Sequence, residues 1–68
     1  MVDSKKLDEL IRESGKKKMY LAEKCGITRQ SFDAKRSGKA TFTLKEAQAL
    51  IDELNISDSR QVVEIFFA

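Results

Sequence analysis

The sequence has no proline and no histidine, and Cys25 is its single cysteine. A lone cysteine cannot form an intrachain disulfide, and without histidine a structural zinc site lacks its usual ligands. No apolar run approaches the ~20 residues that span a bilayer, and the charged start does not read as a signal peptide. We therefore expect a cytoplasmic protein that binds no metal and no cofactor.

The chain also lacks the side chains that most enzymes use. There is no histidine, no nucleophile beside a base and no glycine-rich phosphate loop, so catalysis is not expected. Its 68 residues make one domain, 1–68. A domain of this size buries only ~60% of its unfolded surface, so each well-packed contact matters for its stability.

Charge is distributed unevenly along the chain. Residues 15–39 contain eight basic and two acidic residues, a formal +6, whereas the remainder contains five basic and nine acidic residues, a formal −4. The small net charge of +2 conceals this contrast. A basic middle predicts an anionic partner, most often nucleic acid, although a mixed solvated surface also has this composition.

Apolar residues recur at three- and four-residue steps, which predicts an all-α domain of four to five helices. The expected helices cover residues 4–14, 17 or 18 to 25, 28–36 and 43 to about 54. Thr28 is a good N-cap, and Thr43 with Glu46 has the spacing of a capping box. A fifth segment begins near Ser57, and its β-leaning composition leaves helix and strand both open.

Two short expected helices, ending at residue 25 and starting at 28, are joined by a very tight turn. Such a joint requires a small residue at the crossing, a glycine in the turn and apolar side chains in the wedge. The residues that meet these requirements are Leu21, Ala22, Cys25, Gly26, Ile27 and Phe32. With Phe32 facing inward, a period of about 3.6 residues per turn places Arg29, Gln30, Asp33, Ala34 and Ser37 on the outward side.

The stretch LAEKCGITRQSF, residues 21–32, resembles the helix-turn-helix motif of the phage repressor/Cro (lambda-repressor-like) family. The likeness extends more loosely from Leu7 to about Leu54, and TFTLKEAQAL and EIFFA are similar to short phage proteins of this kind. Two positions depart from the family pattern. Lys35 stands where many members have an apolar residue, and Lys18 stands where many have a glutamine that braces the recognition helix.

This resemblance implies that residues 28–36 enter the major groove of double-stranded DNA. The expected base contacts are Arg29 to guanine, Gln30 to adenine and Ala34 to a thymine methyl. Asp33 either accepts from a cytosine amino group or only anchors Arg29.

Three lysines crowd the start of the helix that ends at Cys25, where a helix is already positive and no side chain is placed to cap it. A DNA phosphate would satisfy both the amides and the ammonium groups. The full set of expected phosphate contacts is Lys16, Lys17, Lys18, Thr28, Ser31, Lys35, Arg36 and Lys39. Lys18 has an alternative role, which is to reach inward and brace the next helix.

The apolar tail has two interpretations. It either closes the core of the monomer or forms a two-fold interface, since Cro-like proteins bind pseudo-palindromic sites as dimers. The dimer candidates are Val63, Ile65, Phe66 and Phe67. We expect a phage or prophage transcriptional regulator that acts as a homodimer on the bacterial nucleoid. The alternative is a protein-interaction module, antirepressor- or antitoxin-like, that does not bind DNA.

Overall fold

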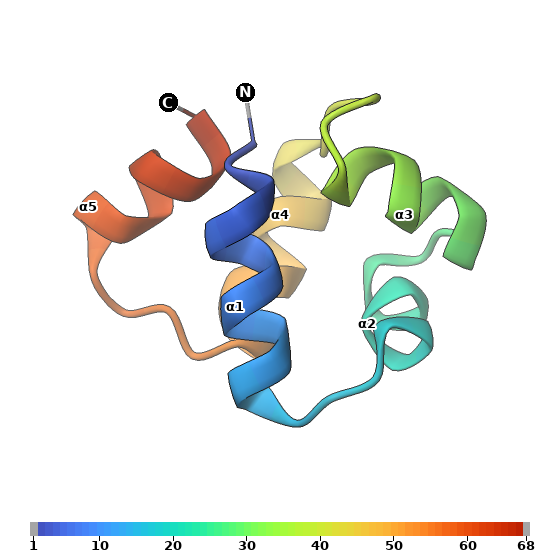
Figure 1. Ribbon diagram of the computed structural model, residues 1–68, viewed down its shortest axis with the longest axis horizontal. Coiled ribbons are helices and arrows are strands. Elements are labelled where there is room, and N and C mark those ends of the chain that lie inside the picture. The colour runs from blue at the N-terminus through green and yellow to red at the C-terminus, as the bar shows by residue number, and fades with distance from the viewer. Residues whose placement is uncertain (1, 68) are drawn as a thin grey trace.

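A computed structural model describes residues 2–67, and within that range the chain folds into five helices and no strand, which confirms the all-α prediction (Figure 1). The helices are α1 Ser4–Ser14, α2 Lys18–Cys25, α3 Arg29–Arg36, α4 Leu44–Glu53 and α5 Ser59–Val62, and α5 continues into a π-helical turn, η1, Val63–Phe67. The strand alternative for the tail is therefore wrong.

Four of the five helices within residues 2–67 have a side-chain N-cap, and the caps of α3 and α4 are the two that the sequence predicts. The backbone N–H of Ser31 donates to the Thr28 hydroxyl at 3.0 Å, and Thr43 and Glu46 form a reciprocal capping box at the start of α4. The start of α2 is the exception, because its N-cap, Lys17, makes no side-chain capping hydrogen bond. The amides that open α2 thus lack a side-chain cap, beside a cluster of lysines.

The turn between α2 and α3 depends on Gly26. Its φ of 76° lies in the left-handed region, where a residue with a Cβ costs about 1–2 kcal/mol. Its N–H donates to the Glu23 carbonyl at 3.0 Å, and the N–H of Ile27 donates to the Ala22 carbonyl at 3.1 Å. These bonds end α2 sharply and allow α3 to pack against it within three residues.

The core is assembled from almost every element. The fully buried large side chains are Leu7 from α1, Leu21 from α2, Phe32 from α3, Leu50 from α4 and Ile65 from η1. The ring of Phe42 stands edge-on between Phe32 and Phe66, with centroid distances of 6.1 and 5.9 Å. Leu44 is 76% exposed because it is the first residue of α4 and lies beyond the core.

The tail closes the monomer. Ile65 and Phe66 are buried in the core, and η1 packs against α1. The backbone N–H of Asp3 donates to the Ile65 carbonyl at 2.7 Å, so the two ends of the described chain lie side by side (Figure 1). Two of the four predicted dimer candidates are therefore used internally, and only Val63 and Phe67, each about half exposed, remain on the surface.

Candidate nucleic-acid interface

The third helix, α3, turns one side to the core and the other to solvent. Phe32 is fully buried, whereas Arg29 and Gln30 at the N-terminal tip are exposed. The outward side forms a shallow hollow that continues into the turn after α3; it is lined by Gln30, Asp33, Ala34, Arg36, Ser37 and Lys39. The predicted base-contact residues beyond Arg29 thus share one surface with Lys39, a predicted phosphate contact.

Asp33 is held by two arginines of its own helix. Its Oδ2 accepts from Nε of Arg29 at 3.1 Å, and its Oδ1 accepts from Nε of Arg36 at 3.4 Å. Because both carboxylate oxygens are occupied, the geometry favours the anchoring role over acceptance from a cytosine. Within residues 2–67 the terminal amino groups of Arg29 donate no hydrogen bond, so its fork is available to a ligand.

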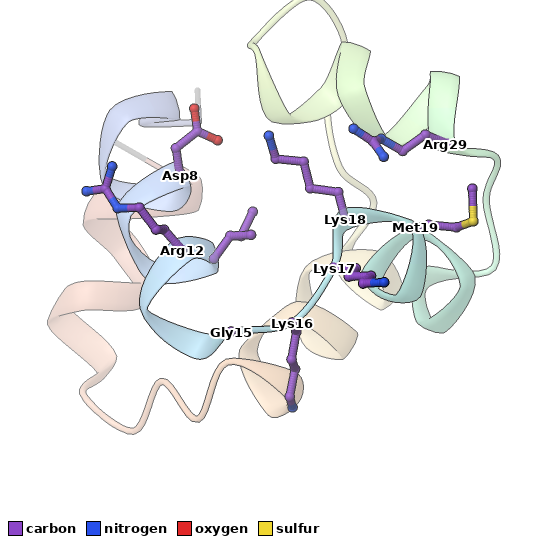
Figure 2. A pocket seen from close by; sticks show the side chains of 9 residues that line it. Asp8, Arg12, Gly15, Lys16, Lys17, Lys18, Met19 and Arg29 are labelled. Atoms are coloured by element: carbon purple, nitrogen blue, oxygen red, sulfur yellow. The ribbon is translucent and has the colours of Figure 1, made fainter.

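A groove opens between α1 and the start of α2, and it has a volume of about 760 Å³ (Figure 2). We call it the basic groove; its lining is Asp8, Ile11, Arg12, Gly15, Lys16, Lys17, Lys18, Met19 and Arg29. In Figure 2 the side chains of Lys18 and Arg29 extend into the space between α1 and α3. Five of its nine residues are cationic and one, Asp8, is anionic, so it favours an anion.

Sequence reasoning missed Arg12 as a member of this groove. Arg12 is exposed on α1 and makes no ion pair among the described residues. One signal pointed to it, because it stands three residues before Gly15, where the chain turns into the lysine cluster. Its inclusion means that cations from three helices, α1, α2 and α3, and from the turn between α1 and α2 line the groove.

The lysine triplet is divided by the fold. All three lysines line the groove, but the ammonium group of Lys16 turns away from it (Figure 2) and reaches the C-terminal end of α4. There Nζ of Lys16 donates to the backbone carbonyl of Glu53 at 2.6 Å and to its Oε1 at 3.1 Å. The hydroxyl of Tyr20 donates to the same oxygen at 3.0 Å. Lys16 therefore ties down the turn before α2, and a phosphate would have to compete with Glu53 for it.

The bonds from Lys16 and Tyr20 also stabilise the charged form of that carboxylate. They hold the pKa of Glu53 below its ordinary value of 4.5, with the Lys16 bond as the larger cause. Glu53 thus remains an anion at neutral pH and remains a partner for Lys16.

Two other predicted phosphate contacts are also engaged in ion pairs. Nζ of Lys35 lies 2.6 Å from Oε1 of Glu46, with side chains only 16% and 12% exposed. The guanidinium of Arg36 donates through NH1 to both oxygens of Asp8 on α1, at 2.8 and 3.0 Å, and this bond raises the pKa of Arg36. These pairs join α3 to its neighbours, so free phosphate-binding capacity lies mainly with Lys17, Lys18 and Lys39.

Cys25 belongs to the wedge between α2 and α3. Its Sγ lies 3.7 Å from the Glu46 carbonyl oxygen, and burial raises the pKa of the thiol to about 11. A thiol with this pKa is almost entirely protonated at neutral pH, so Cys25 acts as a small packing residue.

Two further properties bear on what the interface can bind. Within residues 2–67, no group of three metal-ligating side chains could hold an ion. None of the helices in that range has the length and apolar character needed to cross a membrane.

No family model, curated protein or solved structure matches this chain. Its function therefore has to be inferred from the geometry and charge of its own side chains.

Proposed function

We propose that this chain is a sequence-specific, double-stranded DNA-binding regulator of the phage repressor/Cro type. The observation that carries the proposal is that the outward side of α3 and the basic groove meet at Arg29. This residue lies at the exposed N-terminal tip of α3 and also lines the basic groove. A helix that enters a major groove tip-first would bring both surfaces to DNA together.

The exposed tip of α3 supplies base recognition. The free fork of Arg29 fits guanine O6 and N7, and the exposed amide of Gln30 fits adenine N6 and N7. Ala34 adds a small apolar surface for a thymine methyl. Asp33 acts in this scheme as the anchor of Arg29.

The basic groove supplies the phosphate contacts. Lys17 and Lys18 stand at a helix start that no side chain caps, where the helix dipole and the free amides favour an anion. Arg12 adds a cation from α1, and Lys39 lies on the far side of α3. Phosphates on both sides of the major groove would then hold α3 in register.

The proposed regulator acts as a homodimer in the bacterial cytoplasm, on the nucleoid. Val63 at the start of η1 and Phe67 at its end leave apolar surface exposed, which suits a two-fold contact. Two α3 helices separated by about 34 Å would meet successive major grooves of a pseudo-palindromic operator.

Selection of bound duplexes from a random pool at about 100 mM salt tests the proposal. A selected inverted repeat is expected, and its half-site spacing reports the dimer. In fluorescence anisotropy on the selected duplex, Arg29→Ala should cost about 1–3 kcal/mol and relax the preference at one base. Lys45→Ala, which removes an exposed cation from α4, is the matched control.

A second set of results would contradict the DNA-binding proposal. If the protein binds no duplex even at low salt, the DNA-binding proposal is wrong. Retention of one protein partner without DNA would instead establish the interaction-module alternative, for which the exposed Val63 and Phe67 would be the natural contact surface.

A further inference from the structure

Four side chains of alternating charge form a continuous chain from the tip of α3 to α1. Arg29 bonds Asp33 at 3.1 Å, Asp33 bonds Arg36 at 3.4 Å, and Arg36 bonds both oxygens of Asp8 at 2.8 and 3.0 Å. Arg36 is the most buried member, with a side chain that is 18% exposed. The chain thus links an exposed arginine to a carboxylate on another helix.

The two arginines compete for one carboxylate. Asp33 has Oδ2 on Arg29 and Oδ1 on Arg36, and its bond to Arg36 is the longest of the set. NH1 of Arg36 donates to both oxygens of Asp8 at shorter distances than Nε donates to Asp33, so the closer anionic partner of Arg36 lies outside α3. Without Asp8, the half-buried Arg36 would have only Asp33 as an anionic partner and would draw it away from Arg29.

We infer that Asp8, although it lies on α1 and not on the recognition helix, is a positioning residue for sequence recognition, because it occupies Arg36 and so leaves Asp33 to orient Arg29. This inference rests on the proposed function. It assigns a role in specificity to a residue that adds negative charge to the basic groove, where simple electrostatics would treat it as unfavourable to DNA binding.

The sign of that charge makes the inference testable. Asp8→Asn removes a negative charge beside the groove, so long-range electrostatics alone raises affinity for every duplex alike and leaves their ratio unchanged. Loss of orientation instead lowers the ratio between the selected duplex and a random duplex, by roughly threefold to tenfold, as expected for coupled neighbours. Glu9→Gln is the matched control, since Glu9 is exposed on α1 and makes no ion pair within residues 2–67.

Arg36→Lys is a second variant with the charge of α3 retained. Arg36 donates to Asp33 through Nε and to Asp8 through NH1, and a lysine has one nitrogen in place of these two, so the discrimination ratio should fall in the same direction as for Asp8→Asn. Thermal melting by circular dichroism confirms that each variant is folded at the binding temperature.

A measurement without DNA checks the mechanism directly. In ¹⁵N NMR, the Nε–H signal of Arg29 should shift and exchange faster in Asp8→Asn than in the wild type, and should be unchanged in Glu9→Gln. An unchanged Arg29 signal or an unchanged discrimination ratio in Asp8→Asn overturns the inference alone. A wild type that selects no duplex overturns the proposed function, and the specificity role of Asp8 with it.

Discussion

The carboxylate of Glu46 serves two helices at once. Its Oε1 lies 2.6 Å from Nζ of Lys35, near the end of α3, and 3.0 Å from the backbone N–H of Thr43, which opens α4. One buried acid is therefore both the cap of α4 and the counterion of α3. This explains how Lys35 occupies a position where the resembled family often has an apolar residue: its charge is neutralised inside the fold.

Removal of the buried Glu46 side chain should lower the free energy of unfolding of this small domain substantially. Glu46→Ala loses half of the capping box and leaves the mostly buried ammonium of Lys35 unpaired, at a cost of about 2–3 kcal/mol. Urea unfolding followed by circular dichroism measures this. Lys45→Ala, one residue away and exposed, should change stability by about 0.5 kcal/mol or less. Equal effects of the two variants would contradict the dual role.

Stability should fall in acid. Burial acts to raise the pKa of Glu46, but the bonds from Lys35 and Thr43 outweigh it, so its pKa in the folded state lies below the ordinary 4.5. The pKa of Glu53 is lowered too. A lowered folded pKa gives stability that is complete above the unfolded pKa and is lost as pH falls through the folded value. Melting temperature should therefore be level near neutrality and decrease below about pH 4.5, with a smaller decrease in Glu46→Gln.

Neighbouring lysines should differ in their effect on DNA binding. Lys17→Ala should weaken binding to all duplexes alike and make the slope of log K against log salt shallower by about 0.9. Lys16→Ala should change the slope less, because that ammonium is already bonded to Glu53. Anisotropy titrations at several salt concentrations give both slopes. A slope change at Lys16 as large as that at Lys17 would show that DNA displaces Glu53.

Substitutions of the adjacent Phe66 and Phe67 should have different effects, the first on stability and the second on self-association. Phe66 is 6% exposed, so Phe66→Ala should cost about 3–5 kcal/mol and unfold much of the protein. Phe67 is 51% exposed, so Phe67→Ser should cost about 1 kcal/mol or less while it weakens the proposed homodimer. Melting curves and sedimentation equilibrium measure the two properties. A Phe67→Ser protein that self-associates like the wild type would place the dimer contact elsewhere.

The features that depend on only a few neighbouring residues were predicted well from the sequence. The bounds of α1, the caps at Thr28 and Thr43 and the left-handed turn at Gly26 all follow from local chemistry, and each is confirmed. The outward side of α3 followed from helical periodicity once Phe32 was placed inward.

The sequence did not reveal which charges neutralise one another. Lys16 with Glu53, Lys35 with Glu46 and Arg36 with Asp8 are pairs 11 to 37 residues apart, and no periodicity connects them. As a result, cations that look equivalent in the sequence fall into two groups in the structure. Some form ion pairs within the fold, and others remain available to bind a ligand. The same limitation applies to the tail, where Ile65 and Phe66 are buried by contacts with segments far away in the sequence, among them α1 and Phe42.

The hydrogen bond from Asp3 to Ile65 bears on how the domain is made. Besides α3, the first helix packs against η1, and this second contact forms only after residues 63–67 have been added. During synthesis the side of α1 that faces η1 must therefore stay uncovered while the helices between them emerge. That side of α1 is covered only when the two ends of the described chain meet.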